Sequence, residues 1–281
     1  MAFGNAKQIL ERTSGLSALK LLALTAQYSR PKLAPLSKLM LAPFVRDGAI
    51  LVRYKQSGKK LKALVRVQDQ ESDLHSMLEV IARTVYPLDP TFEAEVVVDG
   101  GANIGLFTLQ ASATYPKATI LLCEPLPRNV EQLRKHLRLN RIEAQLKPVC
   151  IGGEQNRIPF YCRHANASSF DGSEPFEKVL QIEVLRLGDI LEEHVAERVL
   201  IKLDIEGLEV ETLKQYVPTE ERAVILFGEL HHHPQTRPTM ERLFAQYGWS
   251  FVLGDLSGSD AIFEARSPAA QALGLKQQEL H

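Results

Sequence analysis

The sequence has few cysteines and no long apolar run, and each absence narrows the class of protein. Its 281 residues contain three cysteines, Cys123, Cys150 and Cys162, with no C-x-x-C pair. We therefore expect no zinc site, and we predict buried thiols in a reducing compartment. No apolar stretch approaches the ~20 residues that span a bilayer. The expected protein is soluble and cytoplasmic.

The sequence also lacks a strong excess of one charge sign. Its formal net charge of -1 at pH 7 gives no general case for nucleic-acid binding. Only residues 1–46 are strongly basic, with seven lysines and arginines against the single acidic residue Glu11. Leu16, Leu19 and Leu22 recur there at helical spacing. We predict a helix that caps the domain or packs on a partner; contact with a membrane surface and a cleaved transit segment are the alternatives.

A strand, a glycine-rich turn and a helix follow one another at residues 96–111. Three consecutive valines, 96–98, are typical of a strand that is buried on both faces. The pattern Asp99-x-Gly101-x-Asn103-x-Gly105 follows, and such a turn binds a nucleotide at the carboxyl ends of the strands. It departs from the G-x-G-x-x-G spacing, and Asp99 would repel a pyrophosphate. The turn therefore favours S-adenosylmethionine, which has a positive charge and no phosphate.

Repeated strand–helix units predict a doubly wound α/β fold with a mostly parallel sheet. Apolar runs predict strands at 118–123, 144–151, 199–204 and 223–227, with helices at 128–140, up to 216, and at 237–247. The runs at 249–253 and 261–265 are joined by a tight connection, which predicts an antiparallel hairpin. A second hairpin at 49–67 precedes a helix at 73–85. We predict an N-terminal helical and hairpin extension at 1–72, an α/β domain at 73–270 and a tail at 271–281.

Acidic side chains end two of the predicted strands. Glu124 ends the second strand, where a carboxylate can accept hydrogen bonds from the ribose of an adenosine. Pro125 beside it and Ile151 at the end of the third strand are assigned to the same cofactor pocket. Lys202 and Asp204 share one face of a buried strand, so we expect them to bond to each other or to a ligand.

A histidine-rich segment follows the strand at 223–227. Glu229 is followed by three consecutive histidines, 231–233, and they cannot all face one site. His231 or His232 could take a proton from a substrate hydroxyl, assisted by Asp204 and Glu229. Alternatively, Asp204, Glu229 and a histidine could hold a divalent cation that acidifies the hydroxyl. A solvated loop without chemistry is the third interpretation, and the spacing does not decide among them.

Three motifs together resemble the FkbM-type methyltransferases, a class I family that uses S-adenosylmethionine. They are VVVDGGANIGLFT, CEPLPRN and LIKLDIEGLEVETLK, and the resemblance covers residues 73–266. It implies a Rossmann-like, seven-stranded sheet whose last strand is antiparallel. It also implies that Asp99, Gly101, Asn103 and Glu124 line the cofactor pocket, with Asp204 near the reacting centre.

Members of that family generally methylate oxygen on natural products, sugars or glycolipids. We therefore predict an O-methyltransferase that acts on a small-molecule or carbohydrate-like acceptor and not on nucleic acid. A methyltransferase of the same fold that acts on nitrogen, protein or RNA is the nearer alternative. A non-catalytic subunit with the same fold is the farther one.

Overall fold

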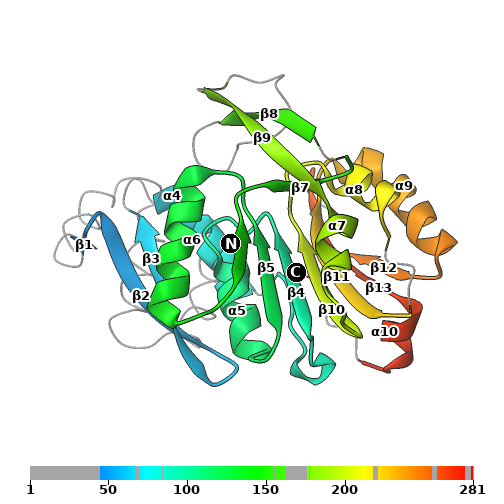
Figure 1. The fold of residues 1–281 in the computed structure, drawn as a ribbon, viewed down its shortest axis with the longest axis horizontal. Helices are drawn as coiled ribbons and strands as arrows, with labels where there is room; N and C mark the ends of the chain where they lie inside the picture. Colours follow the sequence, from blue (N-terminus) through cyan, green and yellow to red (C-terminus); the bar gives the residue numbers. More distant parts are fainter. Residues whose placement is uncertain are drawn as a thin grey trace.

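The computed structural model describes residues 45–66, 70–83, 85–154, 156–162, 176, 178–217, 221–254, 258–275 and 280. Its centre is a seven-stranded sheet (Figure 1). The strands are β4 (Val96–Gly100), β5 (Thr119–Cys123), β6 (Gln145–Lys147), β10 (Arg198–Leu203), β11 (Ala223–Leu230), β12 (Ser250–Leu253) and β13 (Ala261–Arg266). They lie in the order β12-β13-β11-β10-β4-β5-β6, and β13 runs antiparallel to both of its neighbours. The predicted mostly parallel sheet with an antiparallel C-terminal hairpin is confirmed.

Helices cover both faces of this sheet. Helices α5 (Leu106–Thr114), α6 (Pro127–Asn140) and α10 (Pro268–Ala272) pack on one face, and α7 (Leu187–Glu192), α8 (Glu209–Gln215) and α9 (His233–Gln246) pack on the other. Successive side chains of a strand point to opposite faces of the sheet. Val97 packs against the first group of helices, and Val98 packs against the second. This two-sided burial explains the continuous apolar strands and confirms the doubly wound α/β fold.

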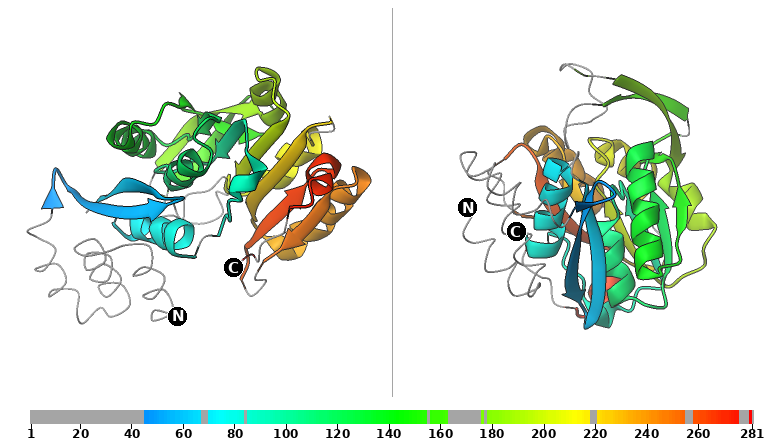
Figure 2. Two further views of the ribbon diagram at one scale, coloured as in Figure 1. Left: turned by 90° about the horizontal axis from the view of Figure 1, so that it is seen from below. Right: turned by 90° about the vertical axis from the view of Figure 1, so that its left-hand side faces the viewer.

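An antiparallel sheet of β1 (Val45–Arg46), β2 (Ala49–Gln56) and β3 (Lys59–Arg66) forms a further layer (Figure 2). Helix α4 (Gln70–Met77) continues directly into a π-helix (Leu78–Arg83), and a short 3₁₀ helix (Pro90–Phe92) precedes β4. Apolar residues of β2 and β3 share a core cluster with Ile104 and Leu106, where α5 begins. The hairpin therefore packs directly on the glycine-rich turn. The proposed domain boundaries stay predictions, and the predicted basic helix lies outside the described residues.

The segment predicted as one strand at 144–151 is two strands in two sheets. β6 extends the main sheet, whereas β7 (Cys150–Gly152) pairs with β9 (Lys178–Arg186), which also pairs with β8 (Asn156–Cys162). Pro148 lies between β6 and β7 and has no N–H to donate, so the ladder ends before it.

The region after the fifth parallel strand also differs from the prediction. Strand β11 continues to Leu230 because β13 pairs with its last six residues, Ile225–Leu230, so Glu229 lies within a strand. Helix α9 begins at His233, four positions before the predicted start, because Pro234 is tolerated in the first turn.

Within the described part of the chain, every helix is too short or too polar to cross a membrane.

Candidate active site

The glycine-rich turn lies against the end of β10. Gly101 has a φ of +69°, and a Cβ on it would lie 1.8 Å from the carbonyl oxygen of Asp204. Only glycine allows both this left-handed conformation and this approach. The turn that begins at Asp99 is therefore packed tightly against Asp204, the residue that follows β10.

The buried side chain of Asp99 stabilises the turn. It is fully buried and accepts a hydrogen bond from Thr108 Oγ1 at 2.5 Å. Lys202 Nζ lies 3.4 Å from Asp99 Oδ1 and 3.4 Å from Asp204 Oδ2, and it donates to the carbonyl of Gly101 at 2.7 Å. The predicted pairing of Lys202 with Asp204 is confirmed. Asp99 itself is not among the described residues that line the neighbouring cavity.

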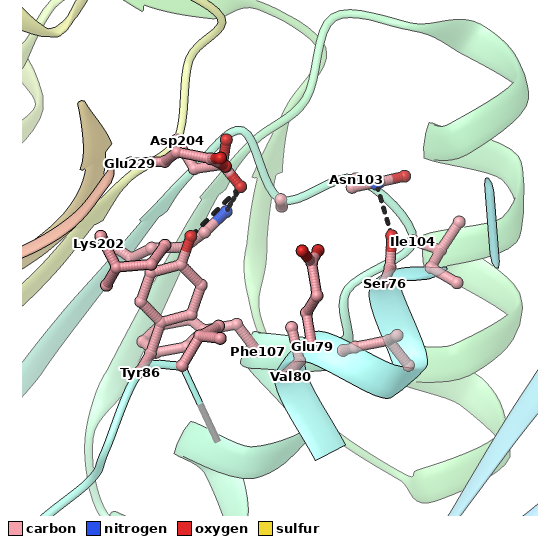
Figure 3. Close-up of a pocket in the computed structure, with 14 residues that line it drawn as sticks. Ser76, Glu79, Val80, Tyr86, Asn103, Ile104, Phe107, Lys202, Asp204 and Glu229 are labelled. Carbon is pink, nitrogen blue, oxygen red and sulfur yellow. Dashed lines mark hydrogen bonds and ion pairs between the residues drawn. The ribbon is translucent and has the colours of Figure 1, made fainter. Parts of the chain in front are cut away.

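That cavity contains about 470 Å³ of empty space, including solvent at its mouth. Figure 3 shows Asp204 and Glu229 on one side and Asn103 on the other, with Glu79 of the π-helix pointing between them. The hydroxyl of Tyr86 donates to Asp204 Oδ2 at 3.4 Å, and its ring meets Phe107 edge-on at 5.6 Å between centroids. Carboxylates and aromatic rings therefore both line the cavity.

Glu124 is buried next to the turn. Its Oε2 accepts from the N–H of Asn103 at 2.8 Å, and its Oε1 accepts from the N–H of Leu126 at 2.9 Å. Burial raises the pKa of Glu124 to about 7, while these hydrogen bonds act to lower it. In this structure the carboxylate holds the turn in place, and its contact with a ribose stays a prediction.

Three other predicted cofactor residues, Gly105, Pro125 and Ile151, are not among the described residues that line the cavity. Gly105, at φ +82°, precedes α5 and packs against Leu133. Pro125 is half-buried, and Ile151 is fully buried, with its Cδ1 2.9 Å from the position of a Cβ on Gly100. Ile151 therefore supports the turn from behind.

A second group of side chains is organised around His231. Its Nδ1 lies 3.1 Å from Glu209 Oε1, which also accepts from the N–H groups of Ile205 and Gly207 at 2.9 and 3.2 Å. Its Nε2 lies 3.8 Å from a carboxylate oxygen of Glu206. A carboxylate that is itself fixed by backbone donors thus orients the imidazole, as an acid–base histidine requires.

The pKa values of His231 and of the neighbouring Glu229 are both raised. Burial acts to lower the pKa of His231, but the hydrogen bond and charge of Glu209 outweigh it and raise the pKa, with help from Glu229 and Asp204. Burial and the charge of Asp204 raise the pKa of Glu229. At neutral pH, the pair therefore retains protons that isolated side chains would lose.

The three consecutive histidines separate as the sequence requires. His231 belongs to the cluster, whereas His232 is exposed at a φ of 52° and caps α9, with its N–H bonded to Asp260. His233 is buried in the first turn of α9, where its Nε2 lies 2.8 Å from the carbonyl of Gly258. His231 alone among them lies with Asp204 and Glu229.

Comparison with known proteins identifies the family. Residues 99–251 match the family model described as the methyltransferase FkbM domain, and this match covers more than half of the chain. The chain belongs to the FkbM methyltransferase family. The matched segment contains the glycine-rich turn, Glu124 and the His231 cluster.

Two curated relatives are similar to part of this chain. Methyltransferase 1 of Beauveria bassiana (strain ARSEF 2860) is 28% identical over an alignment of 159 residues, and the match covers 48% of this chain and 64% of that protein. Methyltransferase sdnD of Sordaria araneosa is 30% identical over an alignment of 152 residues, and the match covers 42% of this chain and 59% of that protein. The matches thus span less than two thirds of the length of either relative. A crystal structure of methyltransferase FkbM from Methylobacillus flagellatus KT matches with 15% identity and a TM-score of 0.44, covering 85% of this chain and 60% of that one.

Several site residues were missed by sequence reasoning. Glu79 and Tyr86 precede the family segment and reach the cavity only because the π-helix folds back over the turn. No spacing or motif marks either residue, so the tertiary structure alone identifies them. Glu209 belongs to the motif LIKLDIEGLEVETLK, but a carboxylate in the first turn of a helix is favoured there on structural grounds alone, so the sequence does not mark it as functional.

Three of the predicted residues also meet the geometry of a metal site. One ligand atom each from Asp204, Glu229 and His231 can be chosen so that all lie within 4.8 Å of one another. Histidine that donates its second nitrogen to a carboxylate, as His231 does to Glu209, is common in such sites.

Proposed function

We propose that this protein transfers a methyl group from S-adenosylmethionine to a hydroxyl oxygen of a small molecule, sugar, glycolipid or natural product. Membership of the FkbM family supports the reaction class. The observation that carries the proposal is the carboxylate-lined cavity next to an imidazole held by Glu209. Such an imidazole can remove a proton from a hydroxyl, which oxygen methylation requires.

The charge of the cavity supports the choice of cofactor. Glu79 and Asp204 line it with negative charge, and Lys202 is the one cation among the described lining residues. This excess of negative charge attracts a sulfonium and opposes a pyrophosphate. The backbone at 101–105 and Glu124 would hold the adenosine end. S-Adenosylmethionine supplies the reactive methyl group when bound.

The chain's own residues supply placement and proton transfer. The acceptor oxygen must lie about 3 Å from the methyl carbon, in line with the bond that breaks. Its hydroxyl proton passes to the pair formed by Glu229 and His231 once that pair has lost a proton, a form that becomes more common as the pH rises. Glu209 and Asp204 stabilise the imidazolium that results. This assignment narrows the predicted base from two histidines to His231.

Binding of a divalent cation by Asp204, Glu229 and His231 is the alternative role of the same residues. Such an ion lowers the pKa of an oxygen that it holds, so that no protein base is needed. Treatment with EDTA distinguishes the two: full activity after chelation rejects the ion, and loss that magnesium or manganese restores rejects His231 as the base.

The test of the proposed function pairs two neighbouring histidines. Labelled S-adenosylmethionine is incubated with the protein and a panel of sugar and natural-product alcohols, and methylated products are identified by mass. We expect His231→Asn to lower kcat about 100-fold or more, whereas His232→Asn, on the exposed cap, retains wild-type kcat. Equal kcat for the two variants refutes the assignment, and label in nitrogen, protein or RNA identifies the alternative acceptor class.

The remaining expectations concern location and partners. We propose a cytoplasmic protein, because Cys123 and Cys150 are buried free thiols. We propose no nucleic-acid partner, and we retain a weak contact of the basic N-terminal segment with a membrane surface or another protein.

A further inference from the structure

Two hydrogen-bond paths lead from strand β3 to the turn at residues 101–105. The turn lies within the segment that matches the family model, residues 99–251, whereas β3 lies well before it. Both paths pass through side chains of α6, which packs against β3 and shares a core cluster with the main sheet.

The first path ends on the carbonyl oxygen of Ile104, a residue that lines the cavity. His136 of α6 is fully buried, with Nδ1 2.6 Å from that oxygen, while its Nε2 accepts from the N–H of Leu64 at 2.8 Å. A neutral imidazole has one donor and one acceptor nitrogen. The two contacts therefore assign the proton to Nδ1, and His136 donates it to Ile104.

The second path ends on the N–H of Asn103. Arg66 Nη2 donates to Asn129 Oδ1 at 3.1 Å, and Asn129 Nδ2 lies 3.4 Å from Glu124 Oε1. Because the oxygen of Asn129 is engaged by a guanidinium, its NH₂ group faces Glu124. The other oxygen of Glu124 accepts from Asn103 at 2.8 Å. The amide of Asn129 thus orients the carboxylate that holds the turn.

The start of this second path is itself fixed. Arg66 places Nη2 2.6 Å and Nε 3.0 Å from the two carboxylate oxygens of Asp73, whose side chain is fully buried. A buried, bidentate pair of this kind resists reorientation. Arg66 is therefore an anchor that does not follow movements of the turn.

We propose that His136 and Asn129 are positioning residues that hold the cofactor turn against strand β3, which makes the N-terminal hairpin part of the cofactor site. They keep the turn in its binding conformation, so cofactor binding does not have to order it. The effect on affinity rests on the proposed function, whereas the effect on the turn itself does not.

The test compares Asn129→Ala with Asn140→Ala. Asn140 is also on α6 and bonds to the same strand, with Oδ1 2.8 Å from the N–H of Lys62 and Nδ2 2.7 Å from its carbonyl. We expect Asn129→Ala to raise the Kd for S-adenosylmethionine about tenfold, with kcat at saturating cofactor unchanged. Asn140→Ala leaves both constants at their wild-type values. Equal Kd values for the two variants overturn the proposal.

A second measurement needs no ligand. Hydrogen exchange at the amide of Asn103 is expected to become about tenfold faster in Asn129→Ala, while the amide of Val98 in β4, which reports global unfolding, is unchanged. If wild-type protein fails to bind S-adenosylmethionine, the proposed function is wrong, and exchange at Asn103 still decides the positioning role. Unchanged exchange in Asn129→Ala refutes that role.

His136 provides a test by conservative substitution. Asparagine at 136 retains a donor near the position of Nδ1 but does not reach Leu64, whereas alanine loses both bonds. We expect cofactor affinity to fall in the order wild type, His136→Asn, His136→Ala. Equal affinities in the asparagine and alanine variants would show that the bond to Ile104 has no role in binding.

Discussion

Substitution of Gly101 by alanine is expected to destabilise the protein in two ways, one conformational and one steric. The first is conformational: at φ +69°, an L-residue other than glycine costs about 1–2 kcal/mol. The second is steric, because the new Cβ would lie 1.8 Å from the carbonyl oxygen of Asp204. The turn and the end of β10 would have to separate by roughly 1.5 Å to reach van der Waals contact.

The same chain contains a matched control for the first cost. Gly48 has a φ of +71°, and a Cβ on it meets nothing within 4 Å. Gly48→Ala is therefore expected to lower the free energy of unfolding by about 1–2 kcal/mol and to leave the site intact. Gly101→Ala adds displacement of the turn, and with it loss of the bond from Lys202 to the Gly101 carbonyl.

The assays are thermal unfolding, calorimetric titration with S-adenosylmethionine, and turnover. A displacement of about 1 Å at a reacting centre costs about 100-fold in rate, so Gly101→Ala should lose about that much kcat/KM. Gly48→Ala should retain wild-type kcat/KM at the same temperature. If both variants lose stability and activity alike, the close approach of the turn to β10 does not matter, and this reasoning is refuted.

Two further predictions concern the chemistry of the cavity. The raised pKa values of Glu229 and His231 keep both groups protonated at neutral pH. Because a base must be deprotonated to accept the substrate proton, the methylation rate should rise as the pH increases into the alkaline range. A rate that does not change with pH contradicts proton transfer to this pair. Tyr86→Phe removes the hydroxyl that donates to Asp204 but keeps the ring, and should lower kcat/KM about fivefold. The control is Tyr115→Phe, which loses a hydrogen bond to the Asp89 carbonyl and should lower stability without changing kcat/KM. Equal kcat/KM values for the two variants exclude a role for the Tyr86 hydroxyl.

Much of the fold could be predicted from local pattern. Strands covered on both faces are continuously apolar, so β4 and β10 were visible in the sequence, and tight connections showed the antiparallel hairpin. The errors lie where pairing partners decide the outcome. β6 and β7 form one apolar run, yet they join different sheets, and β11 is extended by its ladder with β13.

The candidate site divides in the same way. Asp99, Glu124 and Asp204 stand at strand ends, and parallel strands bring their carboxyl ends to one edge, so their proximity followed from the sequence. Their burial did not follow from it. Lys202 of β10 and Thr108 of α5 contact Asp99, and backbone N–H groups donate to Glu124, because other elements fold over these carboxylates.

The sequence by itself determined the sheet, its glycine-rich turn and the family, because periodicity, glycine spacing and charge act over a few neighbouring residues. Only the tertiary structure decided which histidine meets the carboxylates, that Glu79 and Tyr86 enter the cavity, and that β3 supports the turn. Those contacts join residues that are up to 118 positions apart, as from Tyr86 to Asp204. Local preference carries no information about which distant groups will meet, since packing of the whole core selects them.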